Sequence, residues 1–193
     1  MPSKPLQTVC GYSCAVSYQK VLDGKKVVKE RREIKESLKA EVYSKKYKKL
    51  LQMEVNKLSR MIDKKFGYIY CIDCGKPFGK QTDAAHFHSR GANHSLSYNL
   101  HNLHSAKSDC NKYSDTHHSG YEVGLKKRYG EEYFNYVSVD IVLKYKHIKI
   151  TPNEVVEKLA IVRKLIRDFD TFQFTSAINA RNILNELIGI YEN

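Results

Sequence analysis

The chain has 193 residues and a formal net charge of +12, a length that suffices for one compact domain with an appendage or for two small domains. It contains no apolar run close to the ~20 residues of a membrane span and no apolar signal-peptide core, so we expect no membrane partner. The five cysteines, an odd number, favour metal binding or free thiols in a reducing compartment over a disulfide framework.

The positive charge is concentrated in the first third of the chain. Residues 1–66 hold seventeen Lys and Arg against seven Asp and Glu, whereas residues 67–193 hold sixteen against fourteen. A surplus of this kind indicates a polyanionic partner, and a solvated helix face is the alternative explanation.

Two segments make up this basic third. Residues 1–24 contain Cys10 and Cys14, which we interpret as a degenerate cysteine knuckle. Residues 25–66 contain neither Pro nor Gly and predict one long helix, from Lys26 to about Phe66. At ~1.5 Å per residue this helix is roughly 60 Å long, so we expect it to project or to pair with a second copy as a homodimer. Its apolar residues at helical spacing are Ile34, Leu38 and Val42, then Tyr47, Leu51, Val55, Leu58 and Ile62.

Residues 67–136 carry most of the groups that bind metals. Three of the five cysteines and seven of the eight histidines lie between Cys71 and His118. Cys71 and Cys74 form a knuckle that presents two thiolates to one zinc ion, and Cys110 supplies a third, whereas two ordinary buried thiols are the alternative. Lys107 stands where a fourth cysteine is expected. Candidates for the fourth ligand are Asp109, His104, water, Cys10 and Cys14.

The same segment predicts two short strands, a loop and a helix. The strands are predicted at Gly67–Tyr70 and Thr82–Phe87, a turn follows at Arg90 and Gly91, and Asn102–Tyr113 is predicted as a loop that leads into a helix. Strands, loop and helix around a cysteine frame resemble the ββα-metal, or HNH, nuclease motif. That resemblance implies a general base, a loop asparagine and a metal-binding asparagine, at His86, Asn102 and Asn111.

The remaining residues predict one more strand and three helices. We expect a helix over Ser119–Tyr136 that stops near Gly130, and a strand over Val139–Ile150. Residues 137–193 end in a predicted helical hairpin. Its first helix begins at Thr151-Pro-Asn-Glu154, a capping box, and its second covers Ser176–Tyr191. The predicted core residues of the hairpin are Val155, Leu159, Val162, Ile166 and Phe169, then Ile178, Leu184, Leu187 and Ile188.

Several motifs in this order resemble the NinG/Rap family of phage recombination endonucleases over nearly the whole chain. They are Cys71-x-x-Cys74, Asp83-Ala-Ala-His86-Phe-x-Ser-x-Gly-Ala, Leu96-x-Tyr98-Asn99-x-x-Asn102-x-His104, Cys110-Asn111, Tyr121-x-x-Gly124-Leu125-x-x-x-Tyr129-Gly130-Glu131-Glu132, Pro5 to Ala15, and Thr151 to Asp168. The chain departs from the family pattern at Ala85, where the family has Gly and the HNH class has Asp, and at Lys107. It also lacks the first Cys-x-x-Cys of the amino-terminal finger.

The resemblance implies a metal-dependent DNA endonuclease in the host cytoplasm that cleaves branched DNA such as D-loops and Holliday junctions and that works with other recombination proteins. Its catalytic ion would be Mg²⁺ or Mn²⁺, held by Asp83, Asn111 and His104, which could instead orient His86, and its structural ion Zn²⁺. Asp83 and His86 lie three residues apart in a strand, so a bulge is needed for both to reach one metal ion. Expected DNA contacts are Arg90, Lys107, Lys126, Lys127, Arg128, Lys45, Lys46, Lys48 and Lys49.

Two other functions fit the same residues. One is a DNA-binding protein whose HNH site has decayed, and the other is a zinc-ribbon adaptor that acts through protein contacts. We predict an α+β fold that is mainly helical, with a small ββα-metal core, a long basic amino-terminal helix and a carboxyl-terminal helical hairpin.

Overall fold

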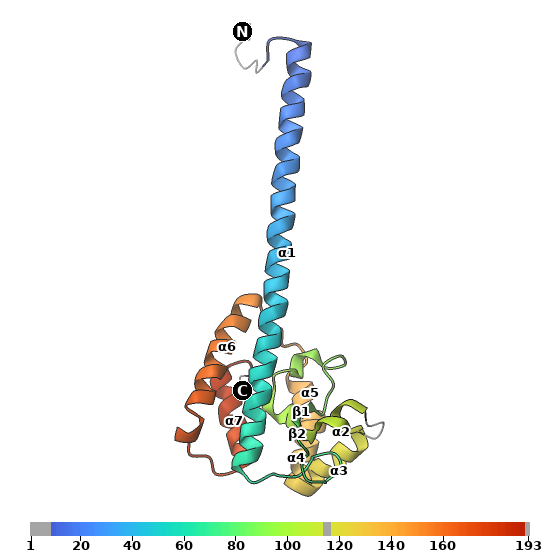
Figure 1. Cartoon of the computed structure of the whole chain (residues 1–193), viewed down its shortest axis with the longest axis vertical. Coiled ribbons are helices and arrows are strands. Elements are labelled where there is room, and N and C mark those ends of the chain that lie inside the picture. The colour runs from blue at the N-terminus through green and yellow to red at the C-terminus, as the bar shows by residue number, and fades with distance from the viewer. Residues whose placement is uncertain (1–8, 114–116, 192–193) are drawn as a thin grey trace. The chain divides into compact units, whose positions relative to one another are not determined.

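A computed structural model describes residues 9–113 and 117–191 of the chain, which divides into two compact units, residues 1–45 and 46–193. Helix α1, Tyr12–Lys65, begins earlier than predicted and continues past Gly24 (Figure 1). One glycine costs a helix interior only about 1 kcal/mol. In the first unit Ile34 and Leu38 are exposed, so the predicted apolar stripe is not buried there, and the side chain of Val42 lies outside the described residues.

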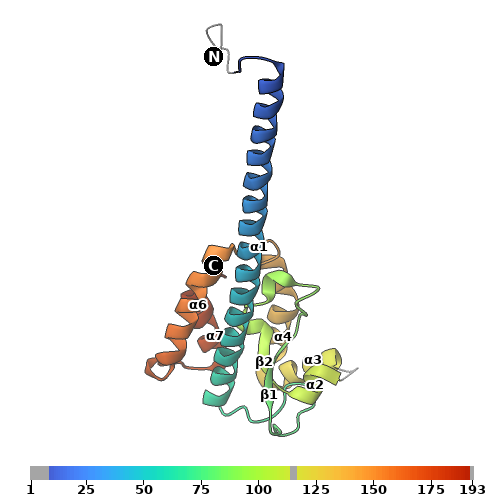
Figure 2. The ribbon, with the colours of Figure 1, turned by 45° about the horizontal axis from the view of Figure 1, so that its top comes forward.

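In the second unit the remainder of α1 forms part of the core. The predicted stripe is confirmed here, because Leu51, Val55, Leu58 and Ile62 are fully buried. This part of α1 contacts helix α6, Pro152–Arg167, on one side and strand β2, Leu103–Lys107, on the other (Figures 1 and 2). The contacts are an ion pair between Glu54 and Arg163 and a hydrogen bond from Ser59 Oγ to the Leu103 carbonyl oxygen.

A two-stranded antiparallel sheet stands at the centre of the second unit. Strand β1, Thr82–His86, pairs with β2 so that Thr82 lies opposite Lys107 and His86 opposite Leu103 (Figure 2). The connection contains two short 3₁₀ turns, η1 at His94–Leu96 and η2 at Leu100–Asn102, and helix α2, Ser108–Tyr113, follows β2 directly. Strands β1 and β2 and helix α2 therefore form a ββα unit, although β2 was not predicted.

The predicted strand at Gly67–Tyr70 is wrong. Only Tyr70 pairs, through an isolated bridge to Pro77, because the chain turns immediately into the cysteine knuckle. The segment that does pair with β1, Leu-His-Ser-Ala-Lys, has weak strand propensity. Long-range hydrogen bonds from α1 fix it instead, since the Asp63 carboxylate accepts from the Ser105 N–H.

In residues 117–191, which the structure describes, every element after the sheet and α2 is helical. Helix α3, His117–Tyr129, ends before Gly130, whose φ of 91° suits glycine, and α4, Glu131–Asn135, a π-helical turn η3, Tyr136–Asp140, and α5, Ile141–Lys144, come next. The predicted strand over Val139–Ile150 is therefore wrong. Ile141 and Tyr145 are buried while Leu143 between them is exposed, and positions four apart lie on one side of a helix as well as of a strand.

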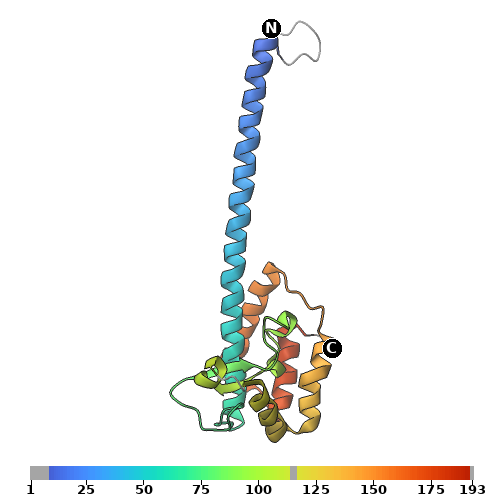
Figure 3. The ribbon, with the colours of Figure 1, turned by 90° about the vertical axis from the view of Figure 1, so that its right-hand side faces the viewer.

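The carboxyl-terminal hairpin is confirmed. Thr151 and Glu154 form the predicted capping box at the start of α6, and after the 3₁₀ turn η4, Phe169–Thr171, helix α7, Ala177–Ile188, packs against α6 (Figures 1 and 3). The expected core residues of the hairpin are buried or partly buried, except Leu187, which is 45 % exposed.

The structure is mostly helical with one small antiparallel sheet, as predicted for an α+β protein. Three parts of the second unit meet at a buried ion pair. Arg181 of α7 and Asp63 of α1 lie 2.6 Å apart, both shielded from solvent, and Arg181 also donates to the carbonyl oxygens of Leu100 and Leu103. Within the described ranges, none of the helices is both long and apolar enough for a membrane crossing.

Candidate functional site

The ββα unit places the three residues of the HNH resemblance at characteristic points. His86 is the last residue of β1, Asn102 immediately precedes β2, and Asn111 lies in α2. Each is therefore held by backbone hydrogen bonds of a regular element or by the turn beside it. Their side chains nevertheless point to different surroundings.

The His86 imidazole is held in a defined tautomer. Its Nε2 lies 3.0 Å from the Ser97 carbonyl oxygen, which also accepts from Gln52 Nε2 at 2.9 Å. Because a carbonyl oxygen only accepts, Nε2 carries the proton and Nδ1 keeps the lone pair. Burial, together with the charge of Arg90, lowers the pKa of His86 to about 4, so the ring is neutral near pH 7. A neutral imidazole can accept a proton at Nδ1, although a pKa this far below neutrality makes it a weaker base than an exposed histidine.

Asn102 fixes the connection between the strands. It is fully buried, its Oδ1 accepts from the His88 N–H at 2.7 Å, and its Nδ2 donates to the carbonyl oxygens of His88 and Leu96. These hydrogen bonds join the side-chain amide of Asn102 to backbone groups. Its part in the site is therefore to shape the loop that carries Arg90 and Ser97.

Asp83 and Asn111 are brought together. Asn111 Nδ2 donates to Asp83 Oδ2 at 3.4 Å. Strand β1 pairs continuously from Thr82 to His86 without a bulge, so Asp83 and His86 point to opposite faces of the sheet. Carboxylate and amide oxygens are the donor types that Mg²⁺ and Mn²⁺ take, and the Asn111 amide would need to turn its oxygen toward such an ion. The pair fits a divalent ion, without His86 in the same ligand set.

His104 lies in the core. It is fully buried, with Nδ1 3.0 Å from the Tyr121 hydroxyl and Nε2 3.4 Å from the Tyr133 hydroxyl. Since Tyr121 donates its own proton to the Ala85 carbonyl oxygen, His104 Nδ1 is the donor in the first of these bonds. Burial lowers the pKa of His104 well below its ordinary value. Both ring nitrogens are occupied, and this placement argues against the expected metal-binding role.

Three of the predicted DNA contacts line one cavity. Lys48 and Lys49 of α1 and Arg90 of the loop after β1 surround a cavity of about 640 Å³, which we call the basic cavity. Gln52 and Ser97, the two partners of His86, line it too. The remaining lining residues are Met53, Asn56, Gly91, His94 and Tyr98. Cations from two segments far apart in sequence thus converge beside the candidate base.

The other predicted DNA contacts lie elsewhere. Lys126 forms ion pairs with Glu122 and Glu131, and Lys127 and Arg128 line a second cavity beside the cysteine knuckle. The positive charge of Lys107 contributes to lowering the pKa of Cys74, which places this lysine near the thiols. Of the lysines in α1, Lys45 belongs to the first unit and pairs with Glu41, and Lys46 is exposed in the second.

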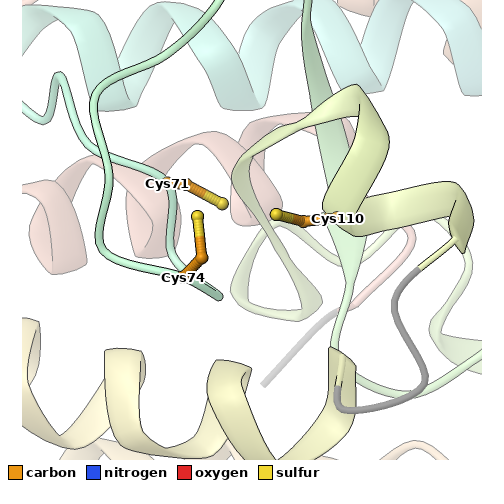
Figure 4. A group of neighbouring side chains, drawn as sticks. All are labelled: Cys71, Cys74 and Cys110. Carbon is orange, nitrogen blue, oxygen red and sulfur yellow. The ribbon is translucent and has the colours of Figure 1, made fainter.

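Cys71, Cys74 and Cys110 form a candidate metal centre. Their sulfur atoms all lie within 4.8 Å of one another, two from the knuckle and one from α2 (Figure 4). The Lys107 N–H donates to Cys71 Sγ at 3.2 Å, as backbone amides do around zinc-bound thiolates. Although burial opposes it, the Lys76 N–H and the neighbouring thiols lower the pKa of Cys74. Three converging thiols fit a soft ion such as Zn²⁺.

No fourth ligand from the described residues of the second unit joins this group. Asp109 is outside it, and His104 is occupied in the core. Cys10 and Cys14 belong to the first unit, where their sulfur atoms lie 2.9 Å apart.

The family model of the bacteriophage lambda NinG protein matches residues 1–171. The chain belongs to the NinG family. No curated protein and no solved structure matches it significantly.

In this NinG-family chain, sequence analysis missed Gln52 and Ser97 as parts of the site. They meet across 45 positions of sequence, and such a contact leaves no trace in local periodicity. It also missed the Asp63–Arg181 pair. The only signal was an acidic residue next to Ile62 of the apolar stripe, which is insufficient to identify a partner in α7.

Proposed function

We propose that this NinG-family protein is a divalent-metal-dependent DNA endonuclease of phage recombination that cleaves branched DNA such as D-loops and Holliday junctions. The observation that carries the proposal is the neutral His86 imidazole beside the basic cavity. Membership of the NinG family supports the phage context.

Hydrolysis of a phosphodiester needs a held phosphate and a base that activates water. Lys48, Lys49 and Arg90 supply the positive charge, and the guanidinium can grip two phosphate oxygens at once. His86 accepts the proton of the attacking water at Nδ1 while Ser97 holds its Nε2–H, so the ring does not turn as it becomes charged. Gln52, bound to the same carbonyl oxygen, positions this pair from α1.

The catalytic ion, Mg²⁺ or Mn²⁺, would be held by Asp83 and Asn111. Such an ion would neutralise charge on a phosphate and assist departure of the leaving oxygen. Because Asp83 points to the face of the sheet opposite His86, the ion and the base would act on one phosphate only after a local rearrangement of β1. Asn102 contributes by fixing the loop, and thereby the distance between Arg90 and the strand that carries His86.

Two features favour a function other than cleavage. Asp83 and His86 lie on opposite faces of the sheet, and Ala85 replaces the aspartate of the HNH class. A DNA-binding protein with a decayed nuclease site, or a zinc-ribbon adaptor, would tolerate both features. Incubation with junction, flap, D-loop and single-strand substrates in Mg²⁺ or Mn²⁺ decides between these functions, because intact substrates under all conditions would favour a binder.

The decisive variant is His86→Ala. Loss of a general base is expected to slow cleavage by about 10²–10⁴-fold, while affinity for DNA stays near that of the wild type because Lys48, Lys49 and Arg90 remain. His147→Ala, which removes an exposed imidazole of the carboxyl-terminal half, is the matched control and should cleave normally. If His86→Ala cleaves at the wild-type rate, or if it loses folding and binding together with cleavage, His86 is not the base.

A further inference from the structure

A second cavity lies beside the cysteine knuckle, apart from the residues assigned to cleavage. It has a volume of about 580 Å³ and combines exposed apolar groups with cations, and we call it the knuckle cavity. Tyr70 is 50 % exposed and Val123 64 % exposed, whereas most large apolar side chains of this unit are buried. Tyr68, Asp73, Lys127 and Arg128 also line it.

Arg128 is fixed at the wall of this cavity. Its Nη2 donates to the Tyr70 carbonyl oxygen at 2.7 Å, and its guanidinium lies over the Tyr68 ring, 4.6 Å from the centroid. Among the described residues its buried Nη1 has no hydrogen-bond partner. The cation and both tyrosines are therefore arranged before any ligand arrives.

The balance of charge around the knuckle cavity favours an anion. Lys127 is exposed at its edge and adds to Arg128. Among the described residues that line the cavity, Asp73 alone is acidic. Its carboxylate packs against Gly120 in the first turn of α3, where the helix dipole offsets its charge. What remains is an open aromatic ring with two cations next to it.

We propose that the knuckle cavity binds single-stranded DNA, with an unpaired base stacked on Tyr70 and the adjoining phosphate held by Lys127 and Arg128. Aromatic rings with flanking cations bind single strands because every base has a face to stack and every nucleotide carries a phosphate. A paired base in a duplex does not offer that face. The choice of DNA rests on the proposed function, since branched DNA exposes unpaired nucleotides.

The test is binding of a fluorescent oligothymidylate, measured by anisotropy at several salt concentrations without added divalent ions. Tyr70→Ala is expected to weaken single-strand binding by roughly five-fold or more, the loss of one stacked base, and to leave duplex binding unchanged. Tyr70→Phe keeps the ring and should bind like the wild type. Lys127→Ala should weaken binding and reduce its dependence on salt.

Leu143→Ala, which truncates an exposed apolar side chain of α5, is the control for an effect of any surface truncation. Thermal unfolding of each variant checks the fold. Single-strand affinity that is unchanged in Tyr70→Ala, or that falls equally for duplex and single strand, overturns the proposal. Cleavage plays no part in these measurements, so an inactive protein that binds single strands through Tyr70 would refute the nuclease and sustain this inference.

Discussion

Two buried histidines show how a single residue ties stability to pH. His101 forms hydrogen bonds with Tyr133 and Asn182, and His104 with Tyr121 and Tyr133. Both imidazole rings are buried. Burial and the charge of Arg181 lower both pKa values, that of His101 to about 3. The folded protein therefore accommodates these rings in the neutral form only.

We predict that the free energy of unfolding declines as the pH falls below about 6.5. There the unfolded chain takes up a proton at each ring while the folded protein does not, so each residue removes about 1.4 kcal/mol per pH unit down to its folded-state pKa. Above pH 6.5 both histidines are neutral in the folded and in the unfolded chain, so they no longer change the free energy of unfolding with pH. Urea titrations at pH 7.5 and 5.5 measure the difference in the free energy of unfolding. His101→Gln should reduce its pH dependence by the contribution of one histidine. Equal midpoints at the two pH values would contradict the assignment.

At the scale of elements, the knuckle and α2 meet where their cysteines lie close together. The loop of Cys71 and Cys74 also packs tightly on α3, where a side chain at Gly124 would overlap the Ile72 carbonyl oxygen. The strand pair, α2 and α3 thus converge on one small centre. A zinc ion there would link the knuckle to α2.

We predict that the purified protein carries about one equivalent of zinc and that Cys110→Ser loses most of it, because two thiolates alone bind zinc weakly. Cys10→Ser/Cys14→Ser is the matched control and should retain zinc, with water as the fourth ligand. Metal analysis after dialysis measures both variants. Full zinc retention in Cys110→Ser would rule out the three-cysteine centre.

The sequence correctly predicted those elements whose stabilising interactions join residues close together in the chain. The stripe through Leu51 and Ile62 and the capping box at Thr151 are set within a few turns of helix, and both are confirmed. The alternation at Ile141 misled because residues four apart suit either period. Strand β2 was missed because its residues have weak strand propensity, and its position depends on pairing with β1 and on hydrogen bonds from α1. His86, Asn102 and Asn111 were predicted from the family pattern, whereas the surroundings of their side chains depend on contacts that only the fold creates.

For the molecule as a whole, the basic surplus is shared between its two units. Residues 1–45 hold ten Lys and Arg against five Asp and Glu, and several of these charges pair along the helix, as Arg32 does with Glu36. The basic cavity, in contrast, lies entirely within residues 46–193.

We predict that removing residues 1–45 leaves a folded protein whose DNA affinity depends less steeply on salt but remains salt-dependent. The logarithmic slope falls by roughly 0.9 for each lost contact with a duplex phosphate, while Lys48, Lys49 and Arg90 stay. Filter binding across a salt series, with a melting curve for the shortened chain, measures this. An unchanged slope would show that the first unit serves assembly, which sedimentation of the full chain would reveal as a dimer.

The ion pair of Asp63 and Arg181 reaches across the limit of the family match. Residue 181 lies beyond the matched range, 1–171, yet its guanidinium compensates a carboxylate inside that range. Loss of one partner would leave the other as an uncompensated buried charge, at a cost of about 3–5 kcal/mol. In related chains the two positions should therefore be inherited together, and a chain that ends before the equivalent of α7 should carry an uncharged residue in place of Asp63. Electrostatics then places the end of the unit that is inherited together at position 181, ten residues past residue 171, where the family match ends.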